Sequence, residues 1–194
     1  MNSLEGLNLH SENITDLEWA AMAREGNPEA VATLVRRHAP RVRAILYPMV
    51  LNHADADDLA QETMAKVAAS LATFRGGAAF STWVHRIAVN TALNFIKRQK
   101  RRAVEILDDA ALARAEDFSA PKPPEQLEAG ETDAAISRAM SRLSPEQRLA
   151  ISLVVLQDMD EREAASVAGC LPATLRWRFH AARKKLKHVL RNLK

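Results

Sequence analysis

The sequence predicts an all-α protein made of two small helical domains joined by a flexible linker. Apolar residues make up 47% of its 194 residues and aromatic residues only 5%, so Leu, Val, Ile, Ala and Met must build the core. This mixture favours helices, and the low numbers of Gly (6) and Pro (8) argue against many short strands and turns. Ser144-Pro145-Glu146-Gln147 is a strong helix start, with a capping serine, a proline at the first helical position and a glutamine at the third.

The helical pattern has one long interruption, which sets the domain boundaries. Residues 1–12 have no clear period and are expected to be mobile. Residues 13–102 form the first domain, which opens with a capping box at Thr15 and Glu18. Residues 103–131 are rich in acids and prolines and are interpreted as a flexible linker, with a short helix at 108–115. Residues 132–194 form the second domain.

Charge is distributed unevenly along the chain. The formal net charge is only +3, but the stretches 94–102 and 172–194 contain Lys and Arg and no acid. Two basic patches suggest two contacts with a polyanion. The alternative is two solvated helix ends whose cations suit the helix dipole.

The composition also predicts where the protein works. Cys170 is the single cysteine, so no intrachain disulfide can form and a reducing, cytoplasmic setting is expected. We see no secretory signal, and the longest apolar runs, such as 151–156, are too short to span a bilayer. No direct membrane insertion is therefore expected.

Residues 160–183 read as a helix, a tight turn at Gly169 and a second helix. The second helix has an apolar face that includes Leu175 and Phe179, and a polar face that includes Arg176 and Arg183. A DNA recognition helix needs one packed side and one charged side that reaches phosphates and base edges. The alternative is an amphipathic helix in a bundle.

Several segments together resemble the extracytoplasmic function (ECF) sigma factors of bacterial RNA polymerase. The stretch 163–183, with its entry segment 143–148, resembles region 4 of that family. The stretch 55–62 resembles the part of region 2 that binds the polymerase clamp, and 74–90 resembles the promoter-melting segment. The sequence departs from the family pattern at Ala173, Trp177 and Asn94, where Gly, a small polar residue and Asp are usual.

The resemblance implies three sets of binding residues. The first set binds core polymerase: Asp55, Asp57, Asp58, Leu59, Gln61 and Glu62. The second set binds the −10 element: Phe74, Arg75, Gly76, Gly77, Trp83, Asn90, Asn94, Lys97, Arg98 and Arg101. The third set binds the −35 element: Thr174, Arg176, Trp177, Arg178, His180, Arg183 and Lys184. Each set also has a plain structural interpretation: a capped helix start, an interhelix turn beside a core tryptophan, and a solvated helix face.

The implied partners are RNA polymerase core, through its β′ clamp helices and β flap, promoter DNA and an anti-sigma factor. No cofactor, metal site or enzymatic activity is expected. Two rival functions remain open at this point. One is a stand-alone helix-turn-helix regulator that binds a palindrome as a dimer. The other is a metal-dependent enzyme acting on nucleic acid, with Asp58 among its carboxylates.

Overall fold

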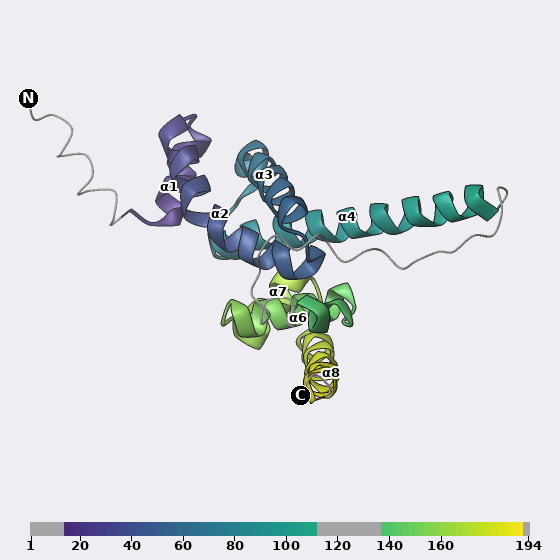
Figure 1. Cartoon of the computed structure of the whole chain (residues 1–194). Coiled ribbons are helices and arrows are strands. Elements are labelled where there is room, and N and C mark those ends of the chain that lie inside the picture. The colour runs from purple at the N-terminus through teal and green to yellow at the C-terminus, as the bar shows by residue number, and fades with distance from the viewer. Residues whose placement is uncertain (1–13, 112–136, 192–194) are drawn as a thin grey trace, which may run out of the picture.

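The computed structural model describes residues 14–111 and 137–191, and the side chains within them apart from those of 105–111 and 189–191. All regular elements in these ranges are helical, which confirms the all-α class (Figure 1). The expected mobile N-terminus at 1–12 and the linker from residue 112 onward lie outside the described residues.

The first helical unit carries the predicted start signals. Thr15 and Glu18 form the capping box, and Asn27 caps the next helix with Pro28 at its first position. Apolar side chains at helical spacing then bring the elements together around one core. The elements of this unit are α1 (Asp16–Arg24), α2 (Pro28–Val50), α3 (His53–Ser70), the 3₁₀ turn η1 (Leu71–Thr73) and α4 (Phe80–Ala111).

Helix α4 extends beyond the expected end of the first domain: it continues past residue 102 to Ala111. Part of the segment interpreted as linker, and the start of the short helix expected at 108–115, therefore belong to α4. The reason is local: residues 103–111 contain no Gly or Pro and include several good helix formers. In Figure 1 this part of α4 projects away from the other helices.

The second helical unit contains the predicted helix-turn-helix. The Ser144–Gln147 capping box is present, Asp160 caps the next helix, and Gly169 adopts the left-handed conformation (φ 62°) that glycine tolerates best. After a helical stretch at 137–141, the elements are α6 (Pro145–Ile151), the π-helical turn η2 (Ser152–Leu156), α7 (Glu161–Ala168) and α8 (Pro172–Arg191).

The two helical units pack against each other along a surface that we call the interdomain seam. Buried residues of the first unit, such as Leu46 and Val84, belong to the same apolar cluster as Leu153, Val167 and Leu175 of the second. The sequence left the relative orientation of the two units open, and the structure shows a closed arrangement with a shared core.

Three arginines add hydrogen bonds across the seam. Arg86 of α4 donates to the carbonyl (2.7 Å) and the hydroxyl (2.6 Å) of Ser166 in α7. Arg41 of α2 donates to the Gln157 carbonyl at 2.8 Å. Arg148 of α6 donates to the Met49 carbonyl at 2.6 Å, near the end of α2 where helical carbonyls lack intrahelical partners.

His85 of α4 is a buried titratable group in the first unit. Its side chain is enclosed, and neither ring nitrogen has a hydrogen-bond partner among the described residues. Burial, with the nearby charges of Arg41 and His38, lowers the pKa of His85 to about 4. The imidazole is therefore neutral in the folded protein near pH 7.

Replacing Arg148 tests the seam. We expect Arg148→Ala to lower the free energy of unfolding by about 1–3 kcal/mol, because it leaves the Met49 carbonyl without its partner. Urea denaturation of the full chain measures this change. Arg142→Ala is the matched control, since Arg142 is exposed in the same unit; equal midpoints for the two variants would contradict a stabilising seam bond.

Protonation of His85 should make stability depend on pH. The folded state holds the pKa near 4 and an unfolded histidine titrates near 6.5, so the unfolded state binds more protons between these values. The contribution of neutral His85 to the free energy of unfolding should be complete above about pH 6.5. As the pH falls to about 4, the free energy of unfolding should decrease by about 3 kcal/mol. Urea midpoints across this range measure it, and His85→Leu should show a shallower decline; identical pH profiles would contradict the assignment.

Candidate nucleic-acid and protein interfaces

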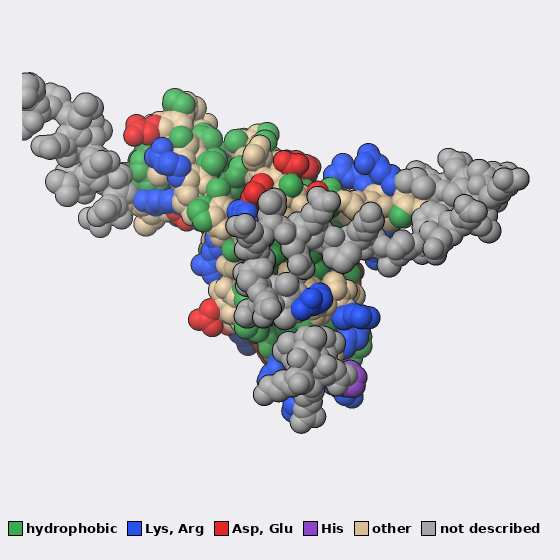
Figure 2. Space-filling view, viewed as in Figure 1, with side chains coloured by type: hydrophobic (Ala, Val, Ile, Leu, Met, Phe, Trp, Pro, Cys, Tyr) green, Lys and Arg blue, Asp and Glu red, His purple; other side chains and the backbone are tan. Residues whose placement is uncertain are grey.

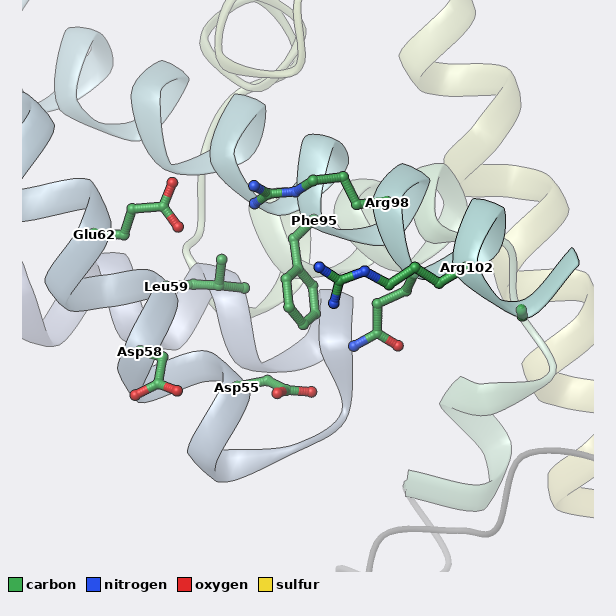
Figure 3. A pocket seen from close by; sticks show the side chains of 9 residues that line it. Asp55, Asp58, Leu59, Glu62, Phe95, Arg98 and Arg102 are labelled. Carbon is green, nitrogen blue, oxygen red and sulfur yellow. The ribbon is translucent and has the colours of Figure 1, made fainter. Parts of the chain in front are cut away.

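The first candidate surface is an acidic row on α3. Asn52 caps this helix by accepting a hydrogen bond from the Asp55 backbone N–H at 3.0 Å, which puts carboxylates in its first turns. A pocket of about 590 Å³ separates this row from α4. The residues lining this α3–α4 pocket are Asp55, Asp58, Leu59, Glu62, Phe95, Arg98, Gln99, Arg102 and Ala103. Figure 3 shows Leu59 and Phe95 between the carboxylates of α3 and the guanidinium groups of α4.

The six residues expected to bind core polymerase do not all face the same way. Asp55, Asp58, Leu59 and Glu62 line the pocket, and the buried Leu59 also belongs to the apolar core. Burial and the neighbouring Asp58 raise the pKa of Asp55. Asp57 instead pairs with Arg43 of α2, and this hydrogen bond lowers the pKa of Asp57. Gln61 is exposed outside the pocket.

Lys66, which the sequence analysis did not predict as a site residue, connects α3 to α4 by hydrogen bonds. The Lys66 ammonium donates to the Glu62 carboxylate at 2.6 Å and to the Thr91 hydroxyl at 3.1 Å. Lys66 lies one helical turn after Glu62, a spacing that favours such a pair. The contact to Thr91 could not be read from the sequence, because it spans two helices.

The second candidate surface is the loop between η1 and α4. Arg75, Gly76 and Gly77 are exposed, and Gly76 has φ 75°, a conformation that other residues adopt only under strain. A Cβ atom at Gly76 would lie 3.6 Å from the side chain of Leu17 in α1, whereas Gly77 faces open space. The loop therefore presents backbone to any ligand beside an apolar side chain.

An aromatic cluster supports this loop. The ring of Phe74 packs edge to face on Phe80 at 5.1 Å between centroids, and Trp83 lies 5.3 Å from Phe74 and 5.5 Å from Phe80. Phe74 is only 5% exposed, so in this arrangement its side chain belongs to the core. Trp83 is half-buried and keeps part of its ring accessible.

Helix α4 carries the remaining residues expected to bind the −10 element. Asn90, Asn94, Lys97 and Arg101 are exposed and recur at helical spacing, so they share one face. Arg98 lines the α3–α4 pocket instead, next to residues assigned to polymerase. No acidic residue occurs from 80 to 102. In Figure 2, acidic side chains over α3 lie next to basic side chains on α4.

The third candidate surface is the outward face of α8. Leu175 and Ala182 are buried in the two apolar clusters, which fixes the opposite side of the helix toward solvent. Arg176, Trp177, His180, Arg183 and Lys184 are exposed, Trp177 to 68%. The Arg183 guanidinium lies over the Phe179 ring at 5.7 Å. Thr174 is half-buried at the edge of this face.

Two of the α8 arginines interact with acids of other helices. Arg176 forms an ion pair with Glu161 of α7, a residue that the sequence did not single out because it lies 15 positions away. Arg178 is half-buried and close to Glu146 of α6. Burial raises the pKa of Glu146, but hydrogen bonds and the charges of Arg178 and Lys100 outweigh it, and the net shift is downward.

Within the ranges 14–111 and 137–191, no group of three or more His, Cys, Asp or Glu side chains could hold a metal ion. In the same ranges, no helix is both long and apolar enough to cross a membrane.

Comparisons with known proteins match both helical units. The family model for sigma-70 region 2 matches residues 34–102, and that for sigma-70 region 4 matches residues 133–186. The chain is 32% identical over 195 residues to the ECF RNA polymerase sigma factor SigE of Mycolicibacterium smegmatis, covering 93% of this chain and 74% of that one. It is 30% identical over 190 residues to the ECF RNA polymerase sigma-E factor of Escherichia coli (strain K12), covering 94% and 98%.

Solved structures agree with these matches. The sigma factor RpoE of Bartonella quintana, solved in complex with the anti-sigma factor NepR, superposes with a TM-score of 0.63 at 26% identity over 82% of this chain and 96% of that one. CnrH, solved with the cytosolic domain of CnrY, has the same fold, with a TM-score of 0.67 at 24% identity over 91% and 97%.

The fold and its charged faces thus define a two-region helical transcription factor. The chain belongs to the ECF RNA polymerase sigma factors. As a member of that family it works with RNA polymerase core in promoter recognition and transcription initiation, a regulatory role.

The buried position of Phe74 predicts a structural role. We expect Phe74→Ala to lower the free energy of unfolding by about 3 kcal/mol, because it empties the space against Phe80 and Trp83. Urea denaturation measures this loss. Arg75→Ala, at the exposed neighbouring position, should leave stability nearly unchanged; a Phe74→Ala protein as stable as that control would show that the cluster does not support the loop.

Proposed function

We propose that this sigma factor divides its contacts among the three surfaces described above. The acidic row on α3 docks on the β′ clamp helices of core polymerase, through Asp55, Asp58 and Glu62. The loop at 74–79 and the exposed face of α4 hold the −10 element. The outward face of α8 lies in the major groove of the −35 element, and the second helical unit contacts the β flap.

The observation that carries this proposal is the separation of charge between the surfaces. The acids that line the α3–α4 pocket attract basic groups of a protein partner, whereas α4 up to residue 102 and α8 expose cations and no acids. Phosphate contacts from such cations supply affinity and position a protein on DNA, while side chains in the groove supply specificity. The two DNA surfaces belong to the two matched regions, in the order in which the family places them.

The loop has physical features that suit an unstacked base. Its exposed backbone around Gly76 and Gly77 leaves room for a base, and Leu17 and the half-buried Trp83 provide apolar surface nearby. Bases taken out of a duplex are commonly held by such stacking and apolar contacts. We assign Arg75 to the adjacent phosphates and exclude the buried Phe74 side chain from direct contact in the closed arrangement.

An anti-sigma factor is the proposed regulator. The related sigma factor RpoE of Bartonella quintana forms a complex with an anti-sigma factor, and this chain shares its fold at 26% identity. We propose a partner of the same class here. We also propose that the chain acts in the cytoplasm, where polymerase and promoter DNA are found.

Binding to core polymerase tests the proposed function. The purified full chain should co-elute with sigma-free core on size exclusion, and the complex should retain promoter DNA that core alone does not. A chain that never associates with core would overturn the proposal and favour the stand-alone regulator.

Asp58→Ala tests the acidic row. Asp58 is exposed in the α3–α4 pocket, so we expect its loss to weaken core binding by about tenfold with no change in folding. Titration of labelled chain with core measures the affinity. Glu29→Ala removes an exposed acid from the first turn of α2 and is the control; equal affinities for both variants would remove Asp58 from the interface.

A further inference from the structure

The ion pair between α7 and α8 has a defined geometry. The Arg176 Nε donates to both Glu161 carboxylate oxygens, at 3.0 and 3.1 Å, and the terminal nitrogen NH2 donates to one of them at 2.5 Å. The carboxylate therefore engages the side edge of the guanidinium, which consists of Nε and one terminal nitrogen. This pairing fixes the plane of a group that would otherwise rotate freely.

The pairing leaves the other edge of Arg176 available. That end edge consists of the two terminal nitrogens, and NH1 has no hydrogen-bond partner among the described residues. Two parallel donors of this kind match the O6 and N7 acceptors of guanine in the major groove. Arg176 lies on the exposed face of α8, near its start, where recognition helices contact bases.

Stabilisation of the fold is a weak explanation for this pair. Both side chains are largely exposed, at 57% for Arg176 and 44% for Glu161, and exposed ion pairs contribute little to stability. Buried Ala164, Ala165 and Leu175 already pack within the core where α7 meets α8. An acid on the DNA-facing side also repels phosphates, which is a cost for affinity.

We propose that Glu161 is a positioning residue for promoter selection: it holds the Arg176 guanidinium so that the free edge reads a guanine of the −35 element. This inference rests on the proposed placement of α8 in the major groove. Glu161 is then expected to affect DNA affinity and base-pair preference in opposite directions. Glu161 should lower affinity for DNA in general, because of its charge, and raise the preference for one base pair, because of its contact with Arg176.

The test uses the full chain bound to core polymerase and a promoter at which this holoenzyme starts transcription. Each −35 base pair is replaced in turn, and the affinity of the holoenzyme is measured for every promoter variant. Four altered chains are compared with the wild type: Glu161→Ala, Arg176→Ala, the double variant, and Glu163→Ala. Glu163 lies in the same first turn of α7 without bonding to Arg176, so its variant reports the general effect of losing an acid there.

The wild type should prefer G·C at one −35 position by about tenfold or more. Arg176→Ala should abolish this preference, and Glu161→Ala should reduce it by about fivefold while binding the mismatched promoters equally well or more tightly. The double variant should match Arg176→Ala, and Glu163→Ala should keep the preference of the wild type.

Two results would overturn the inference. Glu161→Ala could keep the full preference, or it could lose affinity equally at every promoter, as a purely structural residue would. A failure of the proposed function is distinguishable, since a wild-type chain that does not bind core, or that shows no −35 preference at all, would remove the premise.

Discussion

Burial of a common aliphatic core is the constraint on which the rest of this structure depends. With few aromatic residues, the chain must pack Leu, Val, Ile, Ala and Met from helices of both units into continuous clusters. That packing turns one side of α3, α4 and α8 inward. The opposite sides carry exposed charged residues, and those sides are the proposed contacts with polymerase and promoter.

The seam between the two units combines this apolar burial with directional bonds. Arg41, Arg86 and Arg148 each donate to a backbone carbonyl of the other unit. Hydrogen bonds from charged donors are stronger than neutral ones, and each satisfies an acceptor at a helix end or in a connection. The closed arrangement thus places the surfaces assigned to the −10 and −35 elements in one compact body.

Local signals predicted much of the fold. Both capping boxes, the left-handed Gly169 and the two helices around it could be predicted because they depend on residues close together in the sequence. The end of α4 was predicted wrongly. The acidic composition after residue 102 suggested a linker, although the residues up to 111 favour a helix. Contacts across space were also hidden: Arg86 with Ser166, Arg176 with Glu161, and Asp57 with Arg43 join different helices.

In the candidate site, too, local segments could be predicted from the sequence and contacts between distant helices could not. The family resemblance named segments of α3, α4 and α8 and the loop before α4, and most of the residues expected there are exposed. Segment assignment could not show which side chains turn inward. Phe74 enters an aromatic cluster and Leu59 is buried beside the α3–α4 pocket, while Arg98 lines that pocket with residues of α3 rather than the open face of α4. Burial depends on the packing of distant helices, which local patterns do not specify.

Transcription by the reconstituted holoenzyme tests the central claim most directly. Purified chain is added to sigma-free RNA polymerase core, and transcripts are mapped on fragmented genomic DNA from the source organism. We expect new start sites that share two upstream sequence elements, one near −10 and one near −35, and that disappear without the chain. Core that binds the chain but starts at no new site, or start sites that share neither element, would contradict it.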